Sequence, residues 1–154
     1  MANQVEDRLV DSLKNYLQRE RLVTISTIDH VTGGPNVNAI SWVFASDEKQ
    51  ILFAIDSRSK IVKNILQNEH VVITLIANDS IYSISGKTEI VKEILEGVPL
   101  KLSAARLSIQ EVRDIMFYGS KISLEPVYEK TYDALAAAKL DKQVMEALKG
   151  GYYK

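Results

Sequence analysis

The sequence of 154 residues contains no cysteine. Disulfide bonds, thiolate nucleophiles, cysteine-based zinc sites and iron–sulfur clusters are therefore excluded. Only two histidines are present, and neither has a second histidine or a glutamate at a metal-binding spacing. We interpret His30 as a turn residue and His70 as the start of a strand, and we predict no metal site.

The sequence also lacks an excess of charge of either sign and any long apolar run. The net charge is -1, and basic and acidic residues are spread evenly along the chain. A nucleic-acid-binding protein would be expected to carry a basic face, so no nucleic-acid partner is predicted. No run approaches the ~18 apolar residues of a membrane span, and the segment Met1–Asp7 lacks the apolar core of a signal peptide. We therefore expect a cytoplasmic protein that does not enter a membrane.

Familiar catalytic motifs are absent as well. The full patterns Gly-x-Ser-x-Gly, Gly-x-Gly-x-x-Gly and Gly-x-x-x-x-Gly-Lys-Ser/Thr, the last of which is the phosphate-binding loop, do not occur. The adjacent carboxylates Asp47 and Glu48 lie in an expected turn, where solvated surface is the default interpretation. No catalytic side chain is identified, so redox chemistry would require a bound cofactor.

Length and composition fit a single domain spanning residues 1–154, because a chain of this size buries a substantial core. Apolar residues at helical spacing predict an N-terminal helix at about 5–19, with Asn3 and Glu6 as a capping pair and the helix lying as a lid on a sheet. A second stripe predicts a C-terminal helix at about 134–149, with Asp133 as N-cap and a glycine pair at its end.

Between these helices, β-branched and apolar segments separated by turn residues predict an antiparallel sheet. The first three strands are predicted to form a meander. Gly86 indicates a bulge or tight bend within its strand. The segment 102–116 mixes strand and helix spacing, so only part of it is predicted as strand. The pattern is typical of a mainly β fold with flanking helices, an antiparallel barrel rather than a doubly wound α/β sheet. The predicted strands cover 22–28, 37–44, 51–55, 71–76, 82–90 and 122–124.

One stretch carries an unusual charge pattern. An apolar strand stops at Asp56, and Ser59 is predicted to cap a helix by accepting from a first-turn N–H. Arg58, Lys60 and Lys63 then lie at a helix N-terminus, where cations are disfavoured by roughly 0.3–1 kcal/mol each. Free N–H groups, the helix dipole and cationic side chains together predict a phosphate or carboxylate site. The alternative is a solvated basic turn neutralised by Asp56.

The order of elements and this motif resemble the FMN-binding split barrels related to pyridoxamine 5'-phosphate oxidase, over Leu22 to about Gly119. Ser59 matches the serine of the Ser-Arg-Lys type motif that holds the flavin phosphate in that family, and Lys60 matches its first cation. Ile61 stands where a second cation is often found. The resemblance implies that Lys63, one helical turn further, replaces that cation, and that Asn64 occupies a polar position common among smaller relatives.

The resemblance implies a six-stranded antiparallel split β-barrel that binds FMN. It places the flavin ring along Ile40, Ser41 and Trp42, and it places Ile55 and Asp56 in the turn before the phosphate motif. Ala39 stands where the oxidase proper has an arginine. For Trp42 the alternative is a core or dimer-interface residue. Since the flavin of relatives lies between two subunits, a homodimer with flavin at the subunit interface is implied.

The implied activity is an FMN-dependent oxidoreductase with an unknown small-molecule substrate and NADH or NADPH as possible electron donor. The chain is not expected to be a true pyridoxamine phosphate oxidase, because no arginine or histidine follows Arg113 and the tail Lys149–Lys154 shows no folded pattern. One alternative is a non-catalytic flavin or haem binding or sensing module on the same barrel. Another is a structural dimer whose groove is empty because Ile61 has cost the site its affinity.

Overall fold

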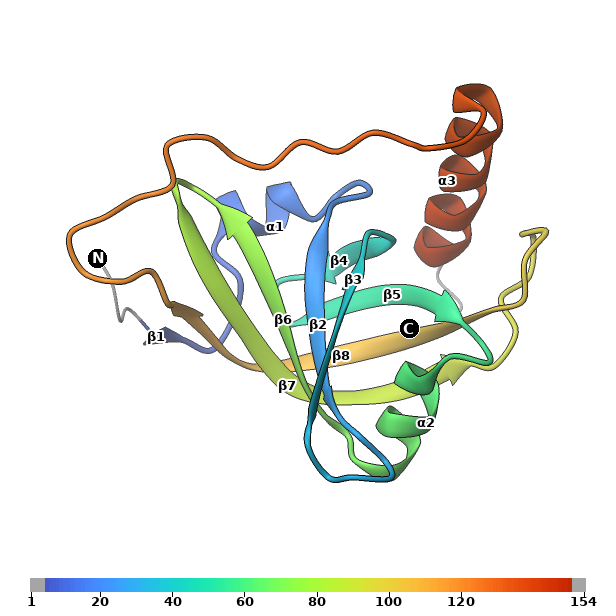
Figure 1. The fold of residues 1–154 in the computed structure, drawn as a ribbon, viewed down its shortest axis with the longest axis horizontal. Coiled ribbons are helices and arrows are strands. Elements are labelled where there is room, and N and C mark those ends of the chain that lie inside the picture. Colours follow the sequence, from blue (N-terminus) through green and yellow to red (C-terminus); the bar gives the residue numbers. More distant parts are fainter. Residues whose placement is uncertain (1–4, 151–154) are drawn as a thin grey trace.

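The computed structural model describes residues 5–150, and the strands in this range form one antiparallel sheet of eight strands (Figure 1). Along the sheet the order is β3-β2-β6-β7-β8-β5-β4, with β1 paired to β8. Strands β3 and β4 follow one another in sequence but lie at opposite ends of this order, so the sheet is a barrel that remains split. The strands are β1 Val5–Glu6, β2 Val23–Ile28, β3 Pro35–Ile40, β4 Val43–Asp47, β5 Gln50–Asp56, β6 His70–Ala77, β7 Ser80–Lys92 and β8 Leu102–Asp114.

The predicted strand 37–44 is wrong as a single element. The structure divides it into β3, which pairs with β2, and β4, which pairs with β5. The break falls at Ser41 and Trp42, where the chain leaves one edge of the split sheet and joins the other. The expected three-strand meander therefore becomes two separate hairpins, because one continuous strand cannot serve both edges.

The predicted N-terminal helix at 5–19 is also wrong in extent. Val5 and Glu6 form β1 and pair with Arg113 and Val112 of β8, and the helix α1 covers only Asp11–Tyr16. The strand β8 is longer than its pairing with β5, so its end offers unpaired backbone groups that β1 satisfies. The predicted capping residue Asn3 lies outside the described residues. The lid interpretation is confirmed, because α1 and its flanks bury Leu9, Leu13 and Leu17 in the core.

The ambiguous segment 102–116 forms the long strand β8, and its helical spacing at Val112, Ile115 and Met116 is misleading. Val112 is buried, whereas Ile115 is exposed and lies beyond the end of the strand. The predicted strand 122–124 is wrong. That segment has no strand assignment, and Ile122 only donates its N–H to the carbonyl of Asp79 at 2.6 Å.

Two clusters of buried side chains explain the run of apolar residues in β5. Ile51, Phe53 and Ile55 face the barrel interior, which α1 and the helix α2 (Lys60–Gln67) help to close. Leu52 and Ala54 face outward and pack against the helix α3 (Ala134–Lys149). Residues 51–55 of this strand are all buried, so both of its faces are covered. Continuous apolar sequence, rather than alternation, is what such a strand requires.

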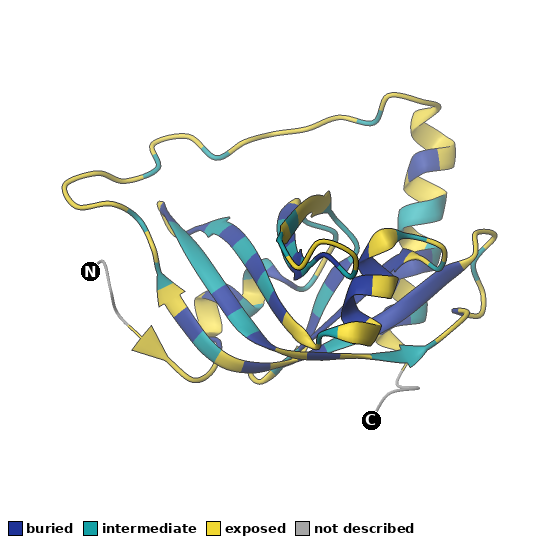
Figure 2. Ribbon diagram, turned by 60° about the horizontal axis from the view of Figure 1, so that its bottom comes forward, coloured by how far each residue is buried: buried dark blue, intermediate teal, exposed yellow. Residues whose placement is uncertain are grey.

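The C-terminal helix was predicted correctly. Helix α3 begins after Asp133, whose carboxylate accepts from the N–H of Leu135 at 3.1 Å. It is joined to β8 by an extended segment, residues 115–133, which we call the strap. Figure 1 shows the strap running over the top of the molecule to α3, and Figure 2 shows it almost entirely exposed. Of the tail Lys149–Lys154, which was predicted to have no folded pattern, Lys149 ends α3 and Gly150 is its C-cap, while residues 151–154 lie outside the described residues.

The bulge predicted at Gly86 is confirmed. The register between β7 and β8 shifts between Ser85 and Gly86. A Cβ atom built on Gly86 would lie 2.0 Å from the backbone oxygen of Ser108, closer than real contacts allow. Glycine is therefore required here by the close approach of the two strands.

Candidate functional site

An open pocket of about 320 Å³ lies where β3 separates from β4, beside the end of β5 and the start of α2. Three segments of sequence meet there: the strand break, the end of β5, and the turn that leads into α2. Six of the ten residues predicted for the site line this pocket. The lining consists of Asn38, Ala39, Ile40, Ser41, Trp42, Ala54, Ile55, Asp56, Ser59 and Ile61.

The strand break gives one wall of the pocket an unusual backbone. The carbonyl of Ser41 accepts from the N–H groups of Arg21 at 2.9 Å and Val43 at 3.0 Å, and the carbonyl of Trp42 accepts from Ala54 at 3.0 Å. Within residues 5–150, the N–H groups of Ser41 and Trp42 donate no backbone hydrogen bond. Backbone donors need an acceptor unless water supplies one, so this wall can offer two N–H groups to a ligand.

The opposite end of the pocket is the turn between β5 and α2. The Asp56 carboxylate accepts from the N–H of Arg58 at 2.8 Å, and the Asp56 carbonyl accepts from Ser59 at 3.0 Å. The hydrogen bond from the Arg58 N–H, with the nearby Arg58 side chain, lowers the pKa of Asp56. These bonds shape the turn so that α2 begins immediately after Ser59.

Ser59 occupies the N-cap position as predicted, but the predicted capping bond is absent. Its Oγ is buried and has no hydrogen-bond partner among residues 5–150. Leaving a buried hydroxyl unpaired costs about 1–3 kcal/mol. The unpaired hydroxyl lies in a residue that lines the pocket, beside the unsatisfied N–H groups of the first turn of α2.

The predicted cations lie around this turn but do not line the pocket. The Arg58 side chain is 81% exposed, with its Nε 3.5 Å from Asp56 Oδ1. Lys63 is exposed on α2. The ammonium of Lys60 forms an ion pair with the carboxylate of Asp29 from the loop between β2 and β3.

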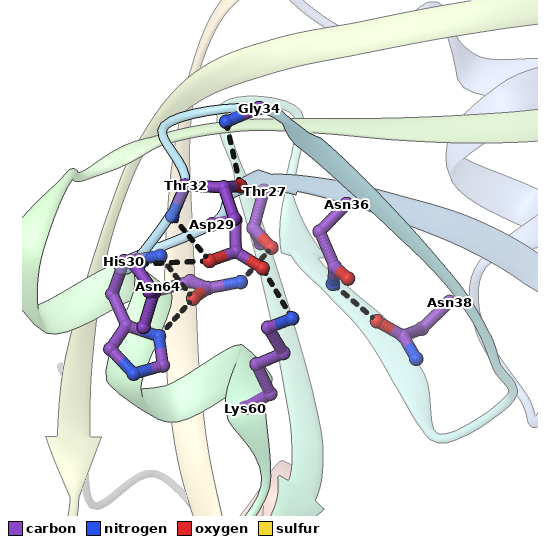
Figure 3. A network of polar contacts seen from close by, with 10 residues as sticks. Thr27, Asp29, His30, Thr32, Gly34, Asn36, Asn38, Lys60 and Asn64 are labelled. Atoms are coloured by element: carbon purple, nitrogen blue, oxygen red, sulfur yellow. Dashed lines mark hydrogen bonds and ion pairs between the residues drawn. The ribbon is translucent and has the colours of Figure 1, made fainter.

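Asp29 is a buried carboxylate that fastens this loop to α2 (Figure 3). One of its oxygens accepts from the N–H groups of Val31 at 2.8 Å and Thr32 at 3.0 Å, and the other contacts Lys60. The hydrogen bond from Lys60, followed by those from the two backbone N–H groups, holds the pKa of Asp29 well below its usual range. Part of the cationic charge expected for a ligand is thus already balanced within the chain.

Asn64, another predicted site residue, belongs to this same loop-holding network. It is fully buried and donates from Nδ2 to the Thr27 hydroxyl at 2.9 Å. Its Oδ1 accepts from the backbone N–H of His30 at 2.9 Å and lies 2.8 Å from His30 Nδ1 (Figure 3). Since both ends of its amide are engaged, Asn64 positions the β2–β3 loop rather than facing the pocket.

Ile61 fills the position where the resembling motif often has a second cation. It is 6% exposed, belongs to the main core and also lines the pocket. The first turn of α2 therefore presents an aliphatic side chain to the pocket, and the nearby cations Arg58, Lys60 and Lys63 lie outside its lining.

Behind the strand break lies a polar network that the sequence did not reveal. The Ser41 hydroxyl donates to Glu20 Oε2 at 2.9 Å, and the Trp42 indole Nε1 donates to Asp141 Oδ1 on α3 at 2.8 Å. The ammonium of Lys130, on the strap, bridges the two carboxylates at 2.6 Å from Glu20 and 2.9 Å from Asp141. A buried indole N–H needs an acceptor, so Trp42 signalled that a partner exists, but not which one.

The charge states of this network follow from its hydrogen bonds. Burial lowers the pKa of Lys130, but its bonds to Glu20 and Asp141 outweigh burial, so that its pKa lies above the ordinary value. Burial raises the pKa of Asp141, and the bonds from Lys130 and Trp42 outweigh burial in the opposite direction. The Tyr128 hydroxyl donates to Glu20 at 3.0 Å, and burial, followed by this bond, raises the pKa of Tyr128. At neutral pH the network holds a charged lysine between carboxylates.

Residues 5–150 contain no cluster of metal-ligating side chains and no membrane-spanning helix. No group of three or more histidine, aspartate or glutamate side chains in this range is arranged to hold a metal ion. Across the same residues, every helix is too short or too polar to span a bilayer.

A family model described as Pyridoxamine 5'-phosphate oxidase matches residues 9–123. Among solved structures, a candidate pyridoxamine 5'-phosphate oxidase of Lactobacillus delbrueckii is similar with 19% identity and a TM-score of 0.59, covering 73% of this chain and 98% of that one. HupZ of Group A Streptococcus gives 16% identity and a TM-score of 0.58 at the same coverage. An F420 reductase gives 17% identity and a TM-score of 0.50, covering 69% and 95%. No curated protein matches the chain significantly.

Proposed function

Because the chain belongs to the pyridoxamine 5'-phosphate oxidase family, we propose that it binds FMN in the pocket between β3, β5 and α2. The phosphate would lie at Ser59 and the first turn of α2. The flavin ring would lie along Ile40, Ser41 and Trp42, and Ile55 and Asp56 would form the turn between the two ends.

The observation that carries this proposal is the buried hydroxyl of Ser59, which has no hydrogen-bond partner among the described residues. A phosphate oxygen at this point would accept from the hydroxyl and from first-turn N–H groups, where the helix dipole also favours an anion. At the other end, the free N–H groups of Ser41 and Trp42 suit the carbonyl oxygens of a flavin pyrimidine ring. The residues present therefore fit both ends of FMN.

The three cationic side chains near the turn would contribute to phosphate binding to different degrees. Lys60 is held close to the turn by Asp29, so a bound phosphate would share its ammonium with that carboxylate. Arg58 and Lys63 have long, exposed side chains that can turn toward a ligand at the cost of side-chain entropy. We propose Ser59 and Lys60 as the fixed part of the phosphate site and Arg58 and Lys63 as its mobile part.

With FMN bound, the proposed activity is that of an oxidoreductase acting on a small molecule, with NADH or NADPH as possible donor. The cofactor would supply the electron transfer, and the chain would bind it, orient it and exclude water. A reductase among the proteins of this fold supports such chemistry. Pyridoxamine 5'-phosphate itself is a poor candidate substrate, because the chain after Arg113 has no arginine to bind a second phosphate bidentately.

We also propose that the working form is a cytoplasmic homodimer with the flavin at the subunit interface. The pocket is open to solvent on one side, and several large apolar side chains on the strap and on β3 are exposed. A second copy that covers these surfaces would enclose the ligand. Light scattering that gives the 17.3 kDa monomer mass in the presence of flavin would contradict the dimer.

A second candidate is a non-catalytic flavin-binding or sensing module. It is favoured by the pocket lining, in which Asp56 is the only titratable side chain among the described residues. The haem form of this alternative would need an axial ligand from elsewhere, because the lining residues within 5–150 include no histidine, methionine, tyrosine or cysteine.

The first test is the absorbance spectrum of the purified protein, followed by NADH or NADPH added to FMN-loaded protein. The oxidoreductase is supported if flavin co-purifies with the protein and the nucleotide bleaches it. An added acceptor should then reoxidise the flavin, and the cycle should repeat over many turnovers of the protein. Bound flavin that neither nucleotide reduces supports the non-catalytic module. Protein that neither carries nor takes up FMN contradicts both.

A further inference from the structure

The network behind the strand break fixes which hydrogen-bonding groups the pocket wall can present. A serine hydroxyl has one hydrogen and two acceptor lone pairs, and an indole N–H can only donate. The Ser41 hydrogen is engaged by Glu20 and the Trp42 N–H by Asp141. Neither side chain therefore has a hydrogen left for a ligand.

Lys130 maintains this arrangement from the strap. Its ammonium contacts Glu20 Oε2, the oxygen that also accepts from Ser41, and Oδ2 of Asp141. A carboxylate that is paired with an ammonium and receives hydrogen bonds stays an acceptor. The Ser41 hydrogen is thus directed at Glu20, and the lone pairs of Oγ remain available on a residue that lines the pocket.

At the strand break itself, Ser41 and Trp42 offer backbone N–H groups as donors, and the side-chain group they offer, Ser41 Oγ, is an acceptor. The complementary ligand edge has an N–H flanked by carbonyl oxygens, which is a cyclic imide. The pyrimidine part of a flavin carries such an edge, with its N3–H between two carbonyl groups.

We propose that Glu20 and Lys130 are positioning residues that make Ser41 an obligate acceptor, so that the pocket selects a cyclic imide edge. This inference rests on the proposed flavin site and adds the residues that set its selectivity. The competing explanation is that the network only fastens the strap and α3 to the barrel.

Fluorescence titration with FMN and with N3-methyl-FMN separates these explanations. The methylated flavin keeps the phosphate, the ring and both carbonyls but has no N3–H. We expect the wild-type protein to bind N3-methyl-FMN about two- to tenfold more weakly than FMN, the range of one neutral hydrogen bond. We expect this ratio to fall toward one in Ser41→Ala, which removes the acceptor, and in Glu20→Ala, which removes the partner of the Ser41 hydrogen and leaves that hydroxyl free to donate.

Tyr128→Phe is the matched control, since it removes a hydrogen bond to Glu20 Oε1 and leaves Oε2 with Ser41. A purely structural network predicts that Glu20→Ala, like Tyr128→Phe, weakens the binding of both flavins together and keeps the ratio, whereas our proposal predicts that Glu20→Ala lowers the ratio and Tyr128→Phe keeps it. If Glu20→Ala does not fold, Ser41→Ala alone decides the question. Equal affinities of wild-type protein for the two flavins would overturn this inference and leave the flavin site standing. Failure to bind FMN at all would remove both.

Discussion

The indole Nε1 of Trp42 donates to Oδ1 of Asp141 at 2.8 Å, across 99 positions of sequence. This bond joins the strand break that lines the pocket to the helix α3. Because Trp42 is the single tryptophan of the chain, its fluorescence reports on this contact directly.

We expect Asp141→Ala to shift the Trp42 emission to longer wavelength and to lower the free energy of unfolding by about 1–3 kcal/mol, because the indole N–H and Lys130 lose a partner. Asp141→Asn keeps an acceptor for the indole, so its emission should stay close to that of the wild type. Emission spectra and urea unfolding check both variants. An unchanged spectrum in Asp141→Ala would show that the bond does not fix the indole.

Helix α3 should stabilise the fold through its buried face. Leu148 is fully buried in the cluster between β5 and α3, beside Leu52 and Val144. Leu148→Ala should therefore lower the free energy of unfolding by about 2–5 kcal/mol. Leu135 on the same helix is 83% exposed, and Leu135→Ala should change it by less than about 0.5 kcal/mol. Similar effects of the two substitutions in denaturant titrations would mean that α3 does not pack on this face.

Gly86 should not tolerate a side chain. Its Cβ would meet backbone atoms of Ser108, which cannot move aside without distorting the bulge, so Gly86→Ala should cost about 1–3 kcal/mol of stability. Gly34→Ala is the control, because a Cβ there would make only an ordinary contact with Thr32 at 3.5 Å. Thermal unfolding of both variants, with the wild type, measures the difference.

The ion pair between Asp29 and Lys60 should make stability depend on pH at the acid end. The folded chain holds the pKa of Asp29 below its ordinary value of 3.8, so the folded state releases this proton more readily than the unfolded one. The stabilisation is therefore complete above the ordinary value and is lost as the pH falls below it toward the folded pKa. Asp29→Asn should be less stable than the wild type at pH 5–8.

The measurement is urea unfolding of the wild type and Asp29→Asn, followed by Trp42 fluorescence at a series of pH values. The stability difference should be constant between about pH 5 and 8 and should shrink below about pH 4. A difference that does not change down to about pH 3 would show that the carboxylate charge of Asp29 is not what matters.

Much of the fold could be predicted from local pattern. Strands bounded by turn residues, the bulge at Gly86 and the C-terminal helix with its Asp133 cap were all predicted, because each depends on residues close together in sequence. The failures have a different cause. The predicted strand 37–44 divides at Ser41, and Val5 pairs with β8. Both outcomes depend on which distant strand is available for pairing, and the local sequence does not carry that information.

The same distinction applies to the site. The turn from Asp56 to Ser59 and the apolar strand before it identified one end of the pocket from sequence. Sequence could not show that Lys60 pairs with Asp29 or that Asn64 holds a neighbouring loop, since both partners come from a different hairpin. Glu20, Lys130 and Asp141 were missed because only the fold brings them together behind Ser41 and Trp42.

The central claim is that the hydroxyl of Ser59 and the first turn of α2 bind the phosphate of FMN. The most direct measurement is calorimetric titration of the wild type and of Ser59→Ala with FMN and with riboflavin, which lacks the phosphate. Charge-assisted hydrogen bonds contribute about 1.5–3 kcal/mol each, so the wild type should bind FMN at least about tenfold more tightly than riboflavin. Ser59→Ala should narrow that gap while leaving riboflavin binding unchanged. Equal affinities of the wild type for FMN and riboflavin would contradict the account.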